Sequence, residues 1–251
     1  MAPAAVLAFI GGLSMGSFVT VVAHRVPRGA SIVQPRSRCP GCGAQVASVD
    51  NVPVVSWLLL RGRCRGCGES ISPLYPLTEL AVGLLYVATV VLLWGDVTEI
   101  LLGLVFVTLL VTITLTDLEQ RIIPNRVLLV AATAALAIVL VGDPGSLAER
   151  AAAAAAAGGL LFLVALAYPR GLGLGDVKLA AVMGLFLGRE VAPAILVALL
   201  VGSLFGLALI AREGASARKR AIPFGPFLAI GGIVGLLAGS TLVDWYLATF
   251  T

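Results

Sequence analysis

Two aspartates lie where long apolar segments meet short polar turns. Asp117 follows the apolar stretch 101–116, and Asp176 precedes another within Gly173-Leu174-Gly175-Asp176-Val177-Lys178. An ionisable side chain in or beside a membrane span is unfavourable unless function requires it. Two carboxylates held close together share a proton and titrate as a unit. One can then activate water while the other polarises a peptide carbonyl and later protonates the leaving amine. The pair therefore predicts a two-carboxylate hydrolase, with neither aspartate assigned to either role.

The residues around Asp176 support this interpretation. Gly173 and Gly175 let the backbone approach a substrate closely and can offer N–H groups to a developing oxyanion. Lys178 either adjusts the acidity of Asp176 or marks the membrane interface, and we favour the interface. The run 171–175 lacks the spacing of a phosphate-binding loop, and no strand precedes it. We expect Gly173, Gly175 and Lys178 to support the substrate.

Each aspartate also has a structural interpretation. Asp176 suits the N-cap of a helix that follows a flexible turn. Asp117 does not, because it ends a span, where the helix dipole disfavours a carboxylate. Arg121, four residues on, is a candidate i,i+4 partner for it. Taken singly, either aspartate is as readily structural as functional, but their shared membrane depth and face favour a functional pair.

The composition indicates an integral membrane protein. The 251 residues are 59% hydrophobic and 12% charged, with a mean hydropathy of +1.06, whereas soluble domains have about 25% charged residues. Continuous apolar runs predict an all-α bundle of about eight transmembrane helices, whereas a barrel would alternate every second residue. The first is expected to be a retained helix, not a cleaved signal peptide. The predicted spans are about 4–23, 74–94, 97–116, 126–142, 151–168, 177–188, 190–211 and 226–248, the sixth short enough to be tilted or partly buried.

The distribution of Lys and Arg predicts the orientation of the chain. Of the 17 basic residues, all but Arg150 and Arg189 fall in alternate loops on one side. By the positive-inside rule, the loop 24–73 is cytoplasmic, both termini lie outside, and Asp117 and Asp176 lie at the cytoplasmic face. The net charge of +4 follows from this asymmetry. It requires no nucleic-acid partner, because aromatic residues do not interleave with the basic ones.

The polar segment 24–73 contains all four cysteines, arranged as two C-x2-C pairs. Cys39 and Cys42 form the first pair and Cys64 and Cys67 the second, and each pair is followed by a glycine. Four thiolates in two chelating pairs suit tetrahedral Zn²⁺ at a closed, structural site. A loop this small gains from such a staple. The alternatives are an iron–sulfur cluster, redox or unliganded thiols, and disulfides, which a reducing cytoplasm disfavours.

Other features are more readily structural. His24 is a tempting catalytic base, but a histidine at the end of a span usually stabilises the helix C-terminus. Small residues four apart predict close helix packing at Gly202/Gly206, Gly231/Gly235 and Gly235/Gly239, and the alanines 151–157 predict the same.

Taken together, the motifs resemble those of the type IV prepilin peptidases, membrane aspartyl proteases with a GxGD motif. Thr20 stands where that family usually has Asn, and Glu119 where many members have a second Asp on which the catalytic dyad does not rely. The resemblance covers nearly the whole chain and rests on segments 16–27, 50–57, 75–80 and 222–227, the two cysteine pairs, Asp117 with Pro124-Asn125, and Gly173-x-Gly175-Asp176-x-Lys178.

This resemblance implies an endopeptidase with Asp117 and Asp176 as its catalytic pair. It would remove the short basic leader of type IV prepilins or pseudopilins after Gly, at the cytoplasmic face of the inner membrane. The resemblance also implies N-methylation of the new N-terminus with S-adenosylmethionine, an activity associated with the cysteine loop; no methyl-donor site follows from the residues themselves. We expect a first transmembrane helix at 1–23, a four-cysteine cytoplasmic domain at 24–73 and a peptidase bundle at 74–251.

Two other classes of protein remain as alternatives. A secondary transporter would use the carboxylates to move protons, but the chain shows no internal repeat and places both carboxylates at one face instead of the midplane. A zinc-stapled scaffold for pilus or secretion assembly would not need either carboxylate for its role.

Overall fold

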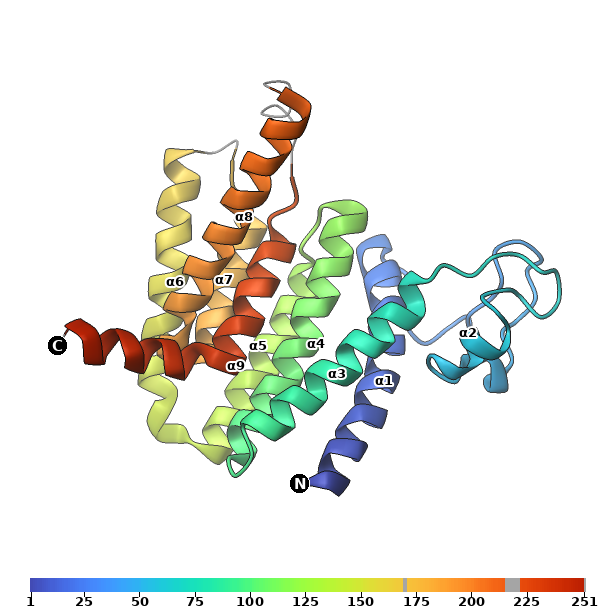
Figure 1. Ribbon diagram of the computed structural model, residues 1–251, viewed down its shortest axis with the longest axis horizontal. Coiled ribbons are helices and arrows are strands. Elements are labelled where there is room, and N and C mark those ends of the chain that lie inside the picture. Colours follow the sequence, from blue (N-terminus) through green and yellow to red (C-terminus); the bar gives the residue numbers. More distant parts are fainter. Residues whose placement is uncertain (169–170, 215–221, 251) are drawn as a thin grey trace. The chain divides into compact units, whose positions relative to one another are not determined.

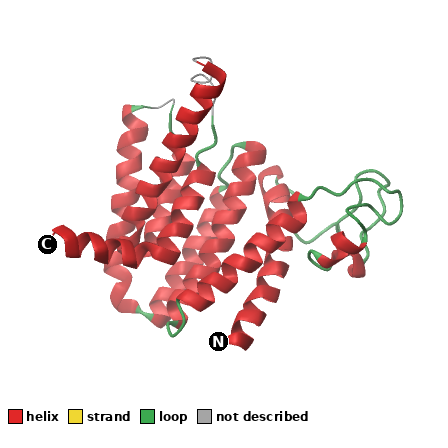
Figure 2. Ribbon diagram, viewed as in Figure 1, coloured by secondary structure: helices red, strands yellow, loops and turns green. Residues whose placement is uncertain are grey.

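The computed structural model describes residues 1–168, 171–214 and 222–250. The chain divides into two compact units, unit 1 (Met1–Trp94) and unit 2 (Gly95–Thr251). Among the described residues, helices and loops account for the fold, with only isolated β-bridges (Figures 1 and 2). The helices are α1 (Ala2–Arg25), α2 (Val55–Leu59), α3 (Leu74–Leu92), α4 (Val97–Gln120), α5 (Asn125–Gly142), α6 (Leu147–Ala167), α7 (Leu174–Leu187), α8 (Val191–Glu213) and α9 (Gly225–Phe250), with 3₁₀ turns η1 (Val26–Arg28), η2 (Ser48–Asn51), η3 (Pro144–Ser146) and η4 (Gly188–Glu190).

All eight predicted spans form helices, which confirms an all-α membrane protein. The sixth is α7, which begins at Leu174, three residues before the predicted start. Its 14 residues reach about 21 Å, less than the roughly 30 Å of hydrocarbon. The described chain has seven stretches that are long and apolar enough to cross a membrane. The number is seven instead of eight because α7, η4 and α8 follow one another directly and together form a single stretch of 40 residues.

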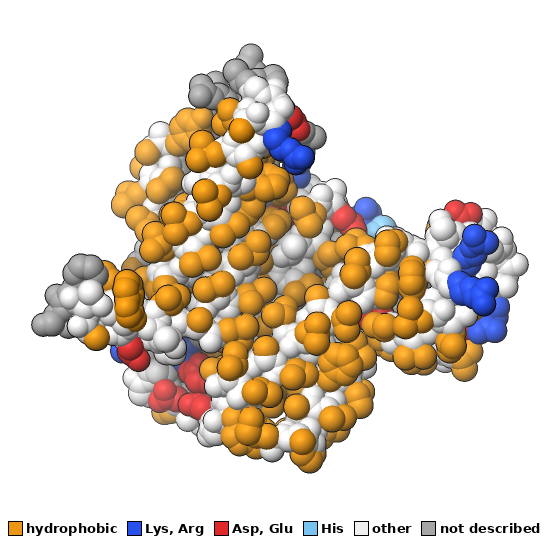
Figure 3. All heavy atoms as spheres, in the orientation of Figure 1, with side chains coloured by type: hydrophobic (Ala, Val, Ile, Leu, Met, Phe, Trp, Pro, Cys, Tyr) orange, Lys and Arg blue, Asp and Glu red, His pale blue; other side chains and the backbone are white. Residues whose placement is uncertain are grey.

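The outer surface of the helices is apolar. Figure 3 shows hydrophobic side chains covering most of the visible helical surface. Large side chains such as Leu129, Val141 and Leu166 are more than half exposed. Contiguous apolar exposure of this extent marks contact with lipid, so the chain is a multi-pass membrane protein.

In unit 1, glycines bring the backbones of α1 and α3 into contact. A Cβ on Gly12 would lie 2.7 Å from the Cα of Gly83, and one on Gly16 would lie 2.6 Å from the Cα of Glu79. Gly12 and Gly16 thus act as a small-xxx-small pair, one that the sequence analysis did not identify. The close approach also buries Glu79.

In unit 2, glycines on α9 pack against α8 as predicted. A Cβ on Gly231 or Gly235 would collide with Ala194, which confirms that pattern. The prediction for Gly202 and Gly206 is wrong as a pair, because Gly202 contacts phenylalanine rings, whereas a Cβ on Gly206 would meet no described atom within 4 Å.

Small residues also join α6 and α7. A Cβ on Gly158 would lie 2.9 Å from the Cβ of Ala181, and one on Gly184 would lie 2.6 Å from the backbone of Ala153. The predicted packing role of the alanine run is therefore confirmed. Beside this contact lies the core of unit 2, where the rings of Phe106 and Phe186 stack with their centroids 4.9 Å apart.

A buried arginine holds the far end of α7. Arg150 of α6 forms an ion pair with Glu99 of α4 and donates a hydrogen bond to the carbonyl of Phe186, in the last turn of α7. It also donates to the Ser146 hydroxyl at 3.1 Å. The last carbonyls of a helix lack partners within that helix, and Phe186 is buried at 2% exposure. Arg150 thus supplies a donor to α7 and joins α4, α6 and α7.

We expect Arg150→Met to lower the free energy of unfolding by about 3 kcal/mol, because it breaks a buried ion pair. This is the lower end of the range for such pairs, and we choose it because the Glu99 side chain is 34% exposed. Thermal unfolding in detergent measures this. The matched control is Arg189→Met, which removes an arginine that is 57% exposed and whose ion pair among the described residues is with adjacent Glu190. Equal effects of the two substitutions would contradict the role given to Arg150.

Candidate active site

The carboxylate of Asp117 is held by the start of α9. Asp117 lies in the last turn of α4 and is 6% exposed. Its Oδ2 accepts a hydrogen bond from the backbone N–H of Gly225 at 2.8 Å. Helix α4 ends where Arg121 adopts φ 55° and donates its N–H to the Asp117 carbonyl at 2.9 Å. The chain then turns through Pro124 into α5.

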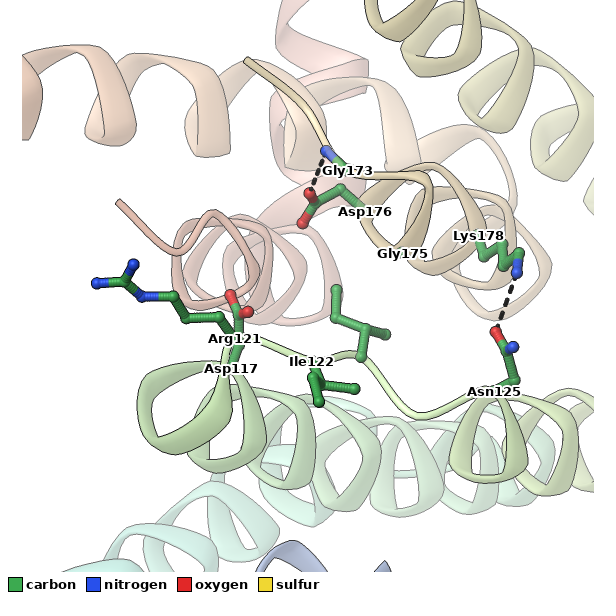
Figure 4. A pocket seen from close by; sticks show the side chains of 9 residues that line it. Asp117, Arg121, Ile122, Asn125, Gly173, Gly175, Asp176 and Lys178 are labelled. Atoms are coloured by element: carbon green, nitrogen blue, oxygen red, sulfur yellow. Dashed lines mark hydrogen bonds between the residues drawn. The ribbon is translucent and has the colours of Figure 1, made fainter. Parts of the chain in front are cut away.

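Arg121, the candidate i,i+4 partner of Asp117, does not form an ion pair with it. Among the described residues Asp117 forms no salt bridge, and the Arg121 guanidinium extends away from the carboxylate (Figure 4). The polar partner of Asp117 is instead the Gly225 N–H, which comes from the segment 222–227 at the start of the last span.

Asp176 lies at the third position of α7, so the predicted N-cap is wrong by three residues. The N-cap is Gly173, whose N–H donates to Asp176 Oδ2 at 3.1 Å. This is the carboxylate half of a capping box. A Cβ on Gly173 would lie 3.2 Å from the same oxygen. The Gly173 N–H therefore orients Asp176, instead of being free for an oxyanion.

Both carboxylates open into one pocket of about 300 Å³. In Figure 4 the side chains of Asp117 and Asp176 enter the same space from α4 and α7. The structure thus brings together two aspartates that are far apart in the sequence, at a spot where both are buried. The pocket is lined by Asp117, Arg121, Ile122, Ile123, Asn125, Gly173, Gly175, Asp176 and Lys178.

The two remaining predicted site residues also reach this pocket. Lys178 Nζ donates to Asn125 Oδ1 at 3.1 Å and so joins α7 to the start of α5. A Cβ on Gly175 would lie 3.1 Å from the Cβ of Ile123, so the glycine lets the α4–α5 turn approach α7. The sequence predicted no role for Gly225, Ile123 or Asn125, although Asn125 and Gly225 lie in segments that carry the family resemblance.

His24 belongs to unit 1 and is exposed at the end of α1. Its Nδ1 lies 3.0 Å from the Arg28 guanidinium, which also donates to the His24 carbonyl. These contacts agree with the structural interpretation of His24 at a helix end.

The four cysteines form two loops of the same geometry. In one, the Cys39 N–H donates to the Ala44 carbonyl at 2.9 Å; in the other, the Cys64 N–H donates to the Glu69 carbonyl at 2.8 Å. Gly43 and Gly68 have φ of 70° and 74°, a region that glycine enters without strain. These are the two glycines that directly follow the cysteine pairs in the sequence.

The sulfur positions fit a metal ion. All four Sγ atoms lie within 4.8 Å of one another, and those of Cys39 and Cys67 are 3.7 Å apart. Tetrahedral zinc with Zn–S bonds of about 2.3 Å requires sulfurs about 3.8 Å apart. Backbone hydrogen bonds from Cys67 and Gly66 lower the pKa of Cys64 to about 7. A backbone hydrogen bond from Glu69 favours the Cys67 thiolate, but burial and the neighbouring thiols raise its pKa to about 12. A dication at the centre would offset the effect of burial and of the neighbouring thiols, and so favour the thiolate form of the cysteines.

Comparison with known proteins agrees with both parts of the chain. Residues 10–93 match the Bacterial Peptidase A24 N-terminal domain, and residues 104–211 match the Type IV leader peptidase family. No solved structure matches the chain.

Named relatives cover nearly all of the sequence. The chain is 36% identical to the prepilin leader peptidase/N-methyltransferase of Aeromonas hydrophila, over 97% of this chain and 94% of that protein. It is 35% identical to the protein of the same name from Bacillus subtilis, over 95% and 96%. A protein of that name from Myxococcus xanthus is 40% identical over 84% of this chain and 64% of its own length. The chain therefore belongs to the type IV leader peptidase family.

Proposed function

We propose that this protein is a membrane aspartyl endopeptidase that removes the leader from type IV prepilins or pseudopilins, with Asp117 and Asp176 as the catalytic pair. The observation that carries the proposal is the single pocket, within the membrane bundle, into which both carboxylates open. The leader peptidases of similar sequence support the choice of substrate.

The reaction needs one proton shared between the two carboxylates. The ionised member takes a proton from water, whose oxygen attacks the carbonyl carbon of the glycine that ends the leader. The protonated member hydrogen-bonds the carbonyl oxygen and later protonates the leaving amine, so that the C–N bond breaks. The N–H groups of Gly225 and Gly173 fix the two carboxylates. Gly175, in the first turn of α7, provides an N–H at the positive end of the helix for the developing oxyanion.

The orientation follows from the positive-inside rule. The basic loops, the pocket and the cysteine-bearing segment face the cytoplasm, and both termini lie outside. A basic leader then reaches the pocket from the cytoplasm while the apolar part of its substrate stays in the inner membrane. Lys178, exposed at the pocket rim, supports the substrate at this boundary.

The four-cysteine segment 24–73 holds a structural Zn²⁺ through Cys39, Cys42, Cys64 and Cys67. Four thiolates complete a tetrahedral site, so the metal would stabilise the fold of this segment and take no part in hydrolysis. The names of the relatives support a second activity, N-methylation of the new N-terminus with S-adenosylmethionine. The segment 24–73 is then the domain associated with methyl transfer, and 74–251 is the peptidase bundle.

Asp117→Asn and Asp176→Asn should each abolish cleavage, because an amide can neither accept the proton of water nor share one with its partner. Each variant should still insert and purify like the natural protein. Co-expression with a prepilin, followed by mass spectrometry of its N-terminus, measures cleavage and detects an added methyl group. Full cleavage by either variant would refute the catalytic pair, whereas the scaffold alternative predicts no cleavage even by the natural protein.

Gly225→Ala should reduce cleavage at least tenfold while the protein still folds. The new Cβ would lie 2.7 Å from Asp117 Oδ2, which forces the carboxylate out of its position, and misplacing a catalytic group lowers the rate steeply. The same assay on purified protein measures this. Gly206→Ala is the matched control, since its Cβ would meet no described atom within 4 Å. If both variants cleaved at the natural rate, the Gly225 N–H would not position Asp117.

Elemental analysis of the purified protein should give about one zinc per chain, and the variant with Cys39→Ser and Cys64→Ser should lose it. Because the variant breaks both chelating pairs, its thermal unfolding should occur at lower temperature. The natural protein should still cleave prepilin after zinc removal, because a closed four-cysteine site stabilises the fold without being needed for hydrolysis. Iron in place of zinc, or unchanged stability without metal, would contradict a structural zinc.

A further inference from the structure

The segment 24–73 presents an apolar surface that nothing in unit 1 covers. The short helix α2 exposes Val55, Leu58 and Leu59, the last with 79% of its surface accessible. Arg61 and Arg63 follow directly and are exposed. We name these five residues the α2 foot. Figure 3 shows basic side chains gathered beside hydrophobic ones on this part of the molecule, which Figure 1 identifies by its α2 label.

Two hydrogen bonds join α2 to the membrane-spanning helix α3 and to the segment that leads into it. The Val54 N–H, just before α2, donates to Glu79 Oε2 at 2.7 Å. The indole N–H of Trp57 donates to the Ile71 carbonyl at 3.0 Å. Val54 has φ 62°, which is unfavourable for a β-branched residue and persists only where the surroundings impose it.

These bonds place α2 at the depth of the first turns of α3. Glu79 is five residues from Leu74, the first residue of α3, which is about 7.5 Å along the helix axis. Tyr75 and Leu77, in the first turn, are exposed, as expected at a membrane–water interface.

The charge of the segment matches an anionic surface. Residues 24–73 contain seven arginines but only two acidic residues, Asp50 and Glu69. Asp50 is engaged by Arg65, with oxygen–nitrogen distances of 2.6–3.1 Å, and this hydrogen bonding holds the pKa of Asp50 below its usual value. Among the described residues, Arg61 and Arg63 have no carboxylate partner.

We infer that the α2 foot is a lipid-binding surface. Val55, Leu58 and Leu59 insert at the boundary between headgroups and acyl chains, and Arg61 and Arg63 bind the phosphates of anionic phospholipids. A bilayer is favoured over a protein partner because the segment is joined at both ends to spanning helices, α1 and α3, so lipid always lies within its reach. The foot would hold the cysteine-bearing segment against the membrane surface.

The test places the full-length protein in nanodiscs and uses Trp57 as the only tryptophan, after Trp94→Phe and Trp245→Phe. Lipids brominated high in the acyl chain should quench Trp57 more than lipids brominated near its end. The added substitutions Leu58→Ser and Leu59→Ser should remove most of this quenching. Val33→Ser is the matched control, because Val33 is 75% exposed in the same segment but lies outside α2. A higher fraction of anionic lipid should increase quenching, and Arg61→Gln with Arg63→Gln should abolish that increase.

Quenching by aqueous iodide but not by brominated lipid would overturn the inference. If the serine variant also lost prepilin cleavage under those conditions, the foot would be a protein-docking surface instead. Asp117→Asn should leave the quenching unchanged, so failure of this inference can be told apart from failure of the proposed peptidase activity.

Discussion

Each of the three buried carboxylates among the described residues accepts a hydrogen bond from a backbone N–H at the beginning of a helix. Gly225 serves Asp117, Gly173 serves Asp176 and Val54 serves Glu79. The first N–H groups of a helix lack partners within it and lie at its positive end. In an apolar bundle with little access to water, these are donors that the fold provides without placing another charge in the membrane.

The use of backbone donors also constrains the catalytic geometry. A backbone N–H moves only with its helix, so the position of Asp117 depends on how α9 packs beside α4, and that of Asp176 on the first turn of α7. Helix α7 is held at both ends by side chains, by Asp176 at its start and by Arg150 near its end. The small residues between α6 and α7 and between α8 and α9 then keep the helices close enough for these bonds to form.

The sequence was sufficient for those features that depend on residue type and local spacing. The apolar runs predicted the helices, the position of two acids at span ends predicted the pocket residues, and the two C-x2-C pairs predicted the cluster of thiols. Features that depend on which helices touch were not predictable. Nothing local to Gly225 shows that its N–H meets Asp117, and the open space beside Gly206 follows only from how α8 packs. The N-cap of α7 is Gly173, three residues before the predicted Asp176. The prediction failed because glycine has no side chain that marks a cap, whereas aspartate is a favoured capping residue.

The walls of the pocket differ in character, and this bears on the kind of substrate they accept. Ile122 and Ile123 are apolar, whereas Lys178 and Asn125 are polar and bonded to one another. A peptide that changes from a polar leader to an apolar helix at the cleaved bond has the same division. Such a substrate can place its polar leader against the polar wall and its apolar helix against the apolar wall only if it binds in one direction. Ile122 lies between Asp117 and Asn125 (Figure 4), so the direction in which the peptide binds decides which of its bonds reaches the carboxylates.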